Sequence, residues 1–400
     1  MGQQDADAFP FDHLDATKLI PEELVPLQVI GRMVLDRWPD NFFAETEQVA
    51  YCPSHVVPGI DFSNDPLLQG RLFSYLDTQL SRLGSTNFHQ IPINAPKCPF
   101  ANHQRDGHMQ RAVPVGRVAY EPNSLSGTSP RETPARGFHS AAITETGEKS
   151  RIRDESFADH YSQARQFYLS QTAYEQAHIA SALVFELSKV EHLHVREAMV
   201  GHLCHIEDSL ASRVAAGLGF EKMPDAPVSA APVREMEPSP ALQIIGKMKD
   251  TLAGRAVGIL IADGSDGAAI DLIRKAATTA GATVKIVAPK VGGATLADGS
   301  RLAVDVQLAG TPSVLFDAVA IILSDDGAKA LSKESAAIDF ARDAFAHLKA
   351  IAADQGGRTL LKIAAIGQDP GVVDAGGADT FIAAAKTRQW LREKLVRTLA

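Results

Sequence analysis

The stretch from Gln69 to Gln79 contains the residues whose types and spacing best suit a chemical role. Arg71 and Tyr75 stand four positions apart, so on a helix their side chains share one face. A guanidinium one turn away favours the charged phenolate over the neutral phenol, and a bound ferric ion favours it further. Arginine suits this task because it stays charged and presents a rigid fork of donors. The pair could therefore supply a phenolate ligand to iron, although most such pairs are only a surface arginine lying over a tyrosine ring.

The surroundings of this pair favour the ligand interpretation. Residues 71–78 resemble the haem-ligand signature of haem catalases, R-[LF]-x-[SA]-Y-x-D-T, in which the tyrosine is the proximal ligand of the haem iron. Further runs resemble the same family in the same order: Asn41-Phe42-Phe43-Ala44-Glu45, Glu47-Gln48, Pro58-Gly59-Ile60, Leu68-Gln69-Gly70, Asn87-Phe88, Pro92-Ile93-Asn94, Gln104-Arg105-Asp106-Gly107 and Tyr120-Glu121-Pro122-Asn123-Ser124. The resemblance extends to the C-terminus and is to the large-subunit type, which carries an extra α/β domain.

The resemblance implies which residues would bind the cofactor. Tyr75 would be the axial ligand of the haem iron and Arg71 its electrostatic partner. The other expected cofactor-binding residues are Tyr51, Pro53, Leu67 and Gln79. Gln79 stands where small-subunit catalases usually carry histidine, which again favours the large-subunit type. Because that type generally lacks bound NADPH, we expect haem, b-type or modified, and no NADPH.

The distal catalytic residues of the family have no counterpart in the sequence. Family members use a histidine, in a V-x-H-A-R-G-like run, as the acid and base that helps cleave the O–O bond, and an asparagine that orients the peroxide. No such run occurs, and His13 lies in a different context. We therefore assign no catalytic residue and expect a truncated or split member of a family that disproportionates hydrogen peroxide to water and dioxygen. The alternatives are a non-enzymatic haem-binding or assembly protein and a degenerate remnant without haem.

Other residues could compete for a metal. Cys52 lies beside the expected haem site and could replace Tyr75 as the iron ligand, although a small buried thiol is the simpler interpretation. Nothing at the spacing of His55 supports ligation. A further group looks like a metal site but lacks the spacings of tetrahedral zinc, so we expect helix-face histidines instead: His192, His194, His202, Cys204 and His205.

The first part of the chain predicts an α+β fold with an incomplete barrel. Apolar residues alternate over residues 25–35, which indicates a strand. The resemblance assigns residues 1–84 to the late part of a catalase β-barrel and to the haem-ligand helix. Residues 85–155 are rich in Pro, Gly, Ser, Asn and Arg but contain many apolar anchors. By resemblance they form a wrapping segment that threads between the subunits of a homotetramer, and association with a separate N-terminal catalase half is the other expected partnership.

The rest of the chain predicts a helical domain, a linker and an α/β domain. Residues 156–220 have helical periodicity, with a second helix at about 195–217, and the proline-rich residues 221–252 indicate a linker. Within residues 253–400, apolar runs at 257–262, 283–287, 319–323 and 349–353 predict strands, and 268–280 and 336–348 predict helices. This alternation indicates a parallel sheet. The resemblance makes it a flavodoxin-like domain similar to class I glutamine amidotransferases, without their nucleophile because residues 351–357 contain no cysteine.

The charge and composition of the chain argue against some classes of binding partner and some cellular locations. The net charge of -9 argues against nucleic acid and anionic membranes. No apolar run is long enough to span a bilayer, and the acidic N-terminus lacks the order of a signal peptide. The three cysteines are an odd number at unrelated spacings, which indicates reduced thiols. We therefore expect a cytoplasmic protein.

Overall fold

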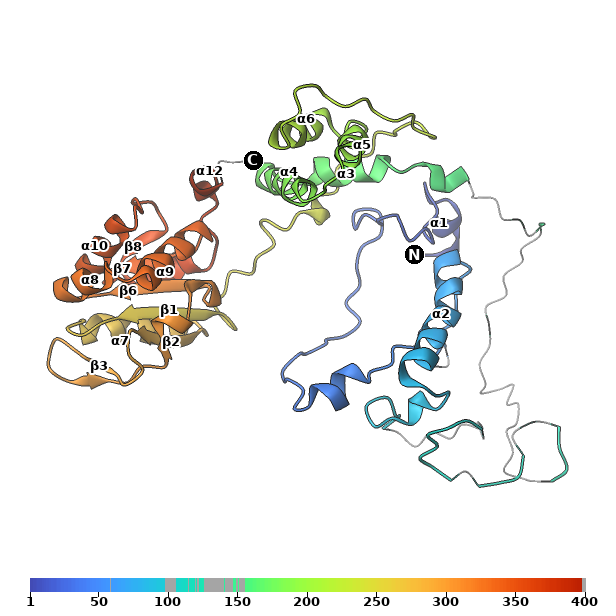
Figure 1. Ribbon diagram of the computed structural model, residues 1–400, viewed down its shortest axis with the longest axis horizontal. Helices are drawn as coiled ribbons and strands as arrows, with labels where there is room; N and C mark the ends of the chain where they lie inside the picture. Colours follow the sequence, from blue (N-terminus) through green and yellow to red (C-terminus); the bar gives the residue numbers. More distant parts are fainter. Residues whose placement is uncertain are drawn as a thin grey trace. The chain divides into compact units, whose positions relative to one another are not determined.

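The computed structural model describes residues 1–57, 59–97, 106–113, 115–118, 120, 122–125, 140, 147–148, 150 and 155–397. The chain divides into two compact units, one of residues 1–163 with 230–234 and the other of residues 164–229 with 235–400. Helices occur in both units, and a parallel sheet occurs in the second (Figure 1). The expected mixture of helix and sheet is therefore confirmed.

The first unit contains helices joined by irregular chain. Its longest described helix, α2 (Pro66–Leu83), is drawn in light blue in Figure 1. Asp65 caps the start of α2 by accepting the backbone N–H of Leu68, and Gly84 ends the helix with a φ of +76°. The other helical segments are α1 (Gln3–Asp7), a π-helix (Phe43–Glu47) and 3-10 turns at Phe88–Gln90 and Glu155–Ala158.

The strand expected at residues 25–35, and with it the partial β-barrel, is wrong for the described part of the first unit. Residues 26–39 have no regular secondary structure, and the described residues before Ala256 form no strand. The alternating side chains Val29, Ile30 and Leu35 are 94, 100 and 88% exposed. A strand needs a neighbour to pair its backbone groups, and alternation within one segment does not provide that neighbour.

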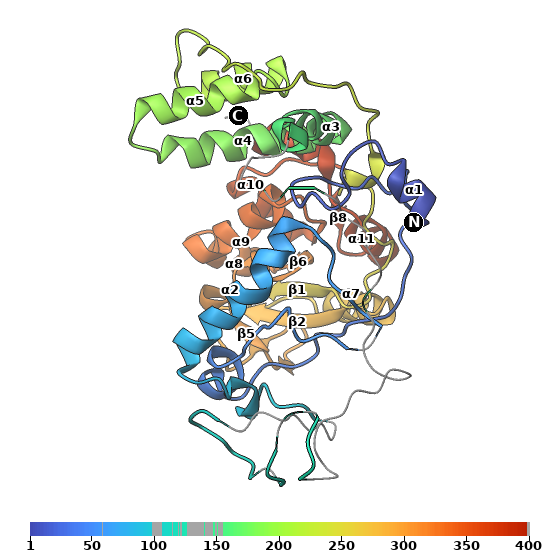
Figure 2. The ribbon, with the colours of Figure 1, turned by 90° about the vertical axis from the view of Figure 1, so that its right-hand side faces the viewer.

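The second unit begins with a cluster of helices, which lie together in both views (Figures 1 and 2). They are α3 (Ser162–Ser170), α4 (Ala173–Ser188), α5 (Leu193–Leu203) and α6 (Asp208–Gly217). The single helix expected at 195–217 is two helices, because Glu207 is extended and starts α6 anew. The guanidinium of Arg165 binds the carbonyl of Ile206 at 2.8 Å and the carboxylate of Glu207 at this break. None of the described helices is both long enough and apolar enough to cross a bilayer.

The sheet of the second unit has six parallel strands in the order β5-β2-β1-β6-β7-β8. The strands are β1 (Ala256–Ile261), β2 (Thr283–Ala288), β5 (Val306–Gln307), β6 (Ala318–Ile322), β7 (Ile351–Ala353) and β8 (Val372–Asp374); β3 (Ala294–Thr295) and β4 (Arg301–Leu302) form a separate antiparallel pair. Without the two-residue edge strand β5, the order is 2-1-3-4-5, which flavodoxin-like sheets use. The four predicted strands are confirmed as β1, β2, β6 and β7.

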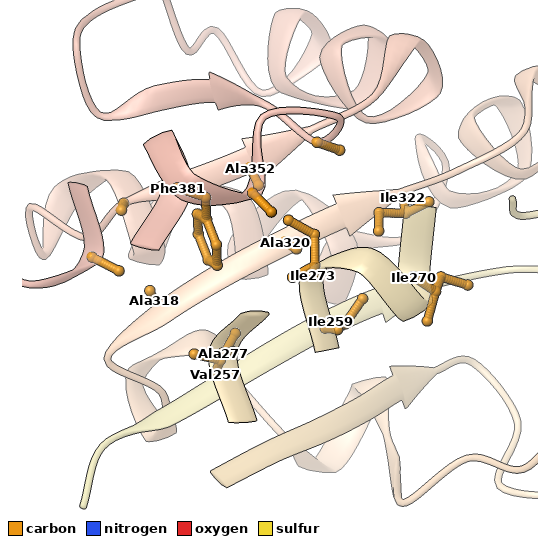
Figure 3. Packing of buried hydrophobic residues seen from close by; sticks show 14 of the residues in the cluster. Val257, Ile259, Ile270, Ile273, Ala277, Ala318, Ala320, Ile322, Ala352 and Phe381 are labelled. Atoms are coloured by element: carbon orange, nitrogen blue, oxygen red, sulfur yellow. The ribbon is translucent and has the colours of Figure 1, made fainter. Parts of the chain in front are cut away.

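Helices cover both faces of this sheet. One apolar core contains residues of α7 (Gly267–Thr279) and α11 (Ala378–Ala385), and Figure 3 shows Ile270, Ile273 and Phe381 directed toward the strands. A second core contains residues of α8 (Asp325–Leu331), α9 (Ser335–Ala346) and α10 (Gln355–Ile363). Strands buried on both faces explain the continuous apolar runs of β1 and β6. The short α12 (Glu393–Val396) follows.

The turn from β7 into α10 begins at Asp354 and contains no cysteine. Here Asp354 occupies the helix N-cap, and its carboxylate accepts the N–H groups of Leu323 at 2.9 Å and Gly357 at 2.7 Å. Burial raises the pKa of Asp354, and the nearby Asp266 raises it further. The carboxyl group therefore joins the start of α10 to the end of β6.

Candidate functional site

The predicted ligand helix exists, and four of the predicted site residues lie along one of its faces. Leu67, Arg71, Tyr75 and Gln79 are spaced by four residues within α2. Residues four apart on an α-helix are neighbours, so the four side chains form a single stripe. The sequence prediction that Arg71 and Tyr75 share a helix face is confirmed.

Arg71 and Tyr75 make direct contact. Nη2 of Arg71 donates a hydrogen bond to Oη of Tyr75 at 3.0 Å, and its guanidinium carbon lies 4.9 Å from the centre of the tyrosine ring. Both residues are half-buried. The phenolic oxygen thus accepts a charge-assisted hydrogen bond from a permanent cation. Its other lone pair is the kind of hard oxygen donor that suits ferric iron.

Tyr51 adds an aromatic neighbour from a distant part of the sequence. Its ring centre lies 5.3 Å from that of Tyr75, with the two planes at 74°. Such an edge-to-face arrangement brings the positive edge of one ring to the negative face of the other. Pro53 is half-buried in the turn that follows. The structure thus brings two predicted site residues, Tyr51 and Tyr75, into contact across 24 positions of sequence.

Gln79 is buried, and its amide is engaged by protein groups. It is 3% exposed, and its Nε2 donates to the carbonyl of Tyr51 at 3.1 Å. Its Oε1 accepts a hydrogen bond from Nη2 of Arg82 at 2.7 Å. Arg82 was missed by the sequence analysis, although it stands three positions after Gln79 and hence on the same side of the helix.

Two apolar side chains of the predicted site are open to solvent. Leu67, on the stripe, is 54% exposed, and Tyr51, beside Tyr75, is 61% exposed. A flat apolar group such as haem could cover surface of this kind, and the phenolic oxygen of Tyr75 would give it an iron ligand. The donor chemistry and the apolar surface therefore fit haem.

The alternative ligands have other neighbours. Sγ of Cys52 lies 3.1 Å from Oγ of Ser54, and the ring of His55 stacks on Phe88 with centres 6.3 Å apart. No contact of Cys52 with Tyr75 is recorded among the described residues. The choice of Tyr75 over Cys52 as iron ligand stays a prediction.

The cluster of histidines lies in the helical part of the second unit. His192, His194 and His202 are exposed, and the first two have ring centres 5.6 Å apart. The ring of His205 contacts the carbonyl of Pro227 at 2.6 Å. Burial raises the pKa of the Cys204 thiol, as does the nearby carboxylate of Asp208. Within the described ranges, no three His, Cys, Asp or Glu side chains are grouped so that they could hold a metal ion.

Some residues of the predicted pattern lie outside the described residues. They are Pro58, Gln104, Arg105 and Glu121, and Cys98, one of the three cysteines expected to be reduced, lies outside the described residues as well. The described residues of the predicted wrapping segment include 85–97 and 106–113, and Asn87 joins these two runs by donating to the carbonyls of Asp106 and His108.

Comparison with known families matches three parts of the chain. Residues 1–127 match the family described as "Catalase", and residues 154–218 match "Catalase-related immune-responsive". Residues 253–391 match the "C-terminal domain found in long catalases". The matches cover α2, the helical cluster and the parallel sheet.

Whole-chain comparison finds relatives of the same kind. The chain is 52% identical over 402 residues to "Catalase C" of Rhizobium meliloti, covering 99% of this chain and 57% of that protein. It is 45% identical over 403 residues to "Catalase HPII" of Pseudomonas aeruginosa, covering 98% and 56%. It is 42% identical over 362 residues to "Catalase-2" of Bacillus subtilis, covering 90% and 52%. The chain thus spans little more than half the length of these relatives.

Proposed function

Because the chain belongs to the haem catalase family and to its large-subunit type, we propose that it forms the proximal side of a haem site for hydrogen peroxide disproportionation. In that reaction two molecules of hydrogen peroxide give two of water and one of dioxygen. The observation that carries the proposal is the contact between Arg71 and Tyr75 on α2. It places a phenolic oxygen beside a fixed positive charge, within the family's own ligand signature.

Each residue has a distinct part in the proposal. Tyr75 would bind the iron through Oη, the oxygen to which Arg71 donates a hydrogen bond at 3.0 Å. Tyr51, Pro53, Leu67 and Gln79 line the cofactor or support its ligand. The bound haem supplies the iron at which peroxide is oxidised and reduced. We take it to be b-type or modified, without bound NADPH.

The acid–base groups of the distal side are proposed to come from an N-terminal catalase half. No run of the sequence resembles the family's V-x-H-A-R-G pattern, and a distal histidine is the group that moves the peroxide proton. We propose association with such a half and assembly into a homotetramer in the cytoplasm. The domains are proposed as residues 1–84, 85–155, 156–220, 221–252 and 253–400, the last being flavodoxin-like and structural.

Co-expression tests this function directly. The 400-residue chain is produced alone and together with the N-terminal half of a large-subunit catalase, and dioxygen release from hydrogen peroxide is measured with an oxygen electrode. We expect activity in the co-purified complex and its loss in Tyr75→Phe. Tyr174→Phe, a change in the helical cluster, serves as the control. An active complex that Tyr75→Phe leaves at full rate would contradict the proposal.

A further inference from the structure

Arg82 connects α2 to a segment that lies more than thirty residues earlier in the sequence. Its Nη1 donates to the carbonyl of Glu47, and its Nη2 donates to the carbonyl of Val49. The same Nη2 donates to Oε1 of Gln79 at 2.7 Å. Arginine can make three such bonds at once because its donors are held in a planar fork. One side chain thus holds an irregular segment against the helix.

Gln79 continues this connection to Tyr51. Guanidinium groups only donate and backbone carbonyls only accept, so the amide of Gln79 has one orientation: Oε1 toward Arg82 and Nε2 toward the Tyr51 carbonyl. Gln79 is also the one buried residue among those of α2. A buried polar side chain with both ends bonded is sensitive to the loss of either partner.

Asn94 completes the attachment of the same segment. Its Oδ1 accepts the N–H of Ala50 at 2.8 Å, and its Nδ2 donates to the carbonyl of Gln48 at 2.9 Å. Each of the five residues 47–51 therefore has a backbone group bonded to the side chain of Arg82, Asn94 or Gln79. The segment after the π-helix has no regular structure, so these side chains, rather than a helix or sheet ladder, determine where it lies.

The position of Tyr51 depends on this attachment. Tyr51 is 61% exposed, so little packing holds its side chain in place. It nevertheless stands edge-to-face with Tyr75, with ring centres 5.3 Å apart. Since the Tyr51 backbone carbonyl is bonded to Gln79, movement of the segment would move the ring away from Tyr75.

We infer that Arg82, acting through Gln79 and the backbone of residues 47–51, is a positioning residue that fixes Tyr51 against the ring of Tyr75. The inference rests on the proposed function, in which Tyr75 binds the haem iron. An edge-to-face neighbour restricts rotation of the Tyr75 ring about its Cβ–Cγ bond, and so restricts the direction in which the phenolate lone pairs point. Arg71 binds the phenolic oxygen of the ligand directly, whereas Arg82 acts on its orientation through Tyr51.

The test uses two readouts on the full 400-residue chain. The first is the tyrosinate-to-iron charge-transfer band after addition of haemin. The second is the nuclear Overhauser effect between the rings of Tyr51 and Tyr75 in the haem-free chain, with 13C-labelled tyrosine, of which the chain contains six residues. We expect Arg82→Gln to shift the band and to weaken the ring-to-ring effect. Arg82→Lys, which keeps the charge but lacks the fork, should lie between Arg82→Gln and the wild type.

The controls separate positioning from general loss of structure. Arg111→Gln removes another exposed arginine of the same unit, one that donates to the carbonyl of Gln90 at 3.1 Å, and should change neither readout. In a Tyr51→Leu background, Arg82→Gln should cause no further shift of the band, because the ring through which Arg82 acts is gone. An equal shift in both backgrounds, or an unchanged ring-to-ring effect in Arg82→Gln, overturns the inference.

Failure of the proposed function gives a different result. If Tyr75→Phe leaves the haem spectrum and affinity of the chain unchanged, Tyr75 is not the iron ligand. The ring-to-ring effect in the haem-free chain still reports whether Arg82 fixes Tyr51 against Tyr75.

Discussion

The guanidinium of Arg71 contacts Tyr75 in two ways. Its Nη2 donates a charge-assisted hydrogen bond to Oη at 3.0 Å, and its guanidinium carbon lies 4.9 Å from the ring centre in a cation–π contact. Lysine could make one of these contacts as a point charge but could not combine a planar fork with stacking. Arginine at position 71 therefore suits an iron-binding tyrosine better than lysine would.

The lowered pKa of the buried Lys349 can be tested through the pH dependence of stability. Its side chain is buried, its ammonium donates to the carbonyl of Ser313 at 2.7 Å, and burial, with Arg388 nearby, lowers the pKa of Lys349 to about 8 from the usual 10.5. Between these two pH values the unfolded chain binds the proton that the folded chain has released. The free energy of unfolding should therefore rise with pH in this window, by up to about 1.4 kcal/mol per pH unit, and the gain should be absent from Lys349→Met.

Urea unfolding followed from pH 7 to pH 10 measures this difference. The exposed Lys333 provides the matched control, since Lys333→Met should leave the rise in place. An unfolding free energy for Lys349→Met that runs parallel to that of the wild type over the whole range would contradict the assignment.

At the residue scale, a contact between residues close together in the sequence could be predicted, whereas contacts between distant residues could not. The Arg71–Tyr75 pair could be predicted because residues four apart on a helix are neighbours whatever the tertiary fold. The contacts of Tyr51 with Tyr75 and Gln79 span 24 and 28 positions, and no local rule brings them together. The family resemblance named Tyr51 and Gln79, but the role of Arg82 became visible only from the tertiary hydrogen bonds.

Gly357 allows α10 to begin directly against β6. A Cβ atom added at Gly357 would lie 2.2 Å from the carbonyl oxygen of Ile321, a distance at which the backbone must move. Gly357→Ala should therefore destabilise the α/β domain by about 3 kcal/mol, the upper part of the range for overpacked cores. Gly367→Ala, where the added atom would meet nothing within 4 Å, is the control, and thermal unfolding is the measurement. Equal midpoints for the two variants would show that α10 adjusts freely.

Glu175 at the start of α4 binds two parts of the chain at once. Its carboxylate accepts the N–H groups of Thr172, Ile244 and Ile245 at 2.9, 2.6 and 2.9 Å. Burial alone would raise the pKa of Glu175, but these hydrogen bonds outweigh it and hold the pKa below its ordinary value of 4.5. Glu175→Gln leaves one acceptor oxygen for these donors and should cost about 1–3 kcal/mol of stability at neutral pH.

The pH dependence of this variant follows from the direction of the shift. A carboxyl group with a lowered pKa in the folded state stabilises fully above pH 4.5 and loses its effect as the pH falls through the folded pKa. The stability difference between wild type and Glu175→Gln should therefore shrink below pH 4.5, as measured by chemical unfolding. A difference that stays constant down to pH 3 would show that charge is unimportant at this cap.

At the scale of elements, strands buried on both faces were easier to predict than the pairing of one strand with another. β1 and β6 are apolar throughout because helices cover both faces of the sheet, so their sequences alone indicate strands. β5 and β8 have two and three residues, too few for a periodic pattern, and were missed. Residues 25–35 have the alternation of a strand, but among the described residues of the first unit no partner strand pairs with them.

For the molecule as a whole, the central claim is that its first 127 residues, the part that matches the catalase family, can present a tyrosinate to haem. The two compact units are distinct, and the proposed ligand, its arginine partner and the residues that position them all lie in the first unit. The second unit contains the helical cluster and the sheet, whose match to the C-terminal domain of long catalases places the chain in the large-subunit type.

The most direct measurement is a titration of the purified chain with haemin, followed by absorption and compared with the same titration of Tyr75→Phe. The account predicts a stoichiometric complex with a high-spin ferric tyrosinate spectrum, and loss of the tyrosinate charge-transfer band in the variant. A spectrum and affinity that are the same in both proteins, or no Soret band beyond that of free haemin in either, would contradict it.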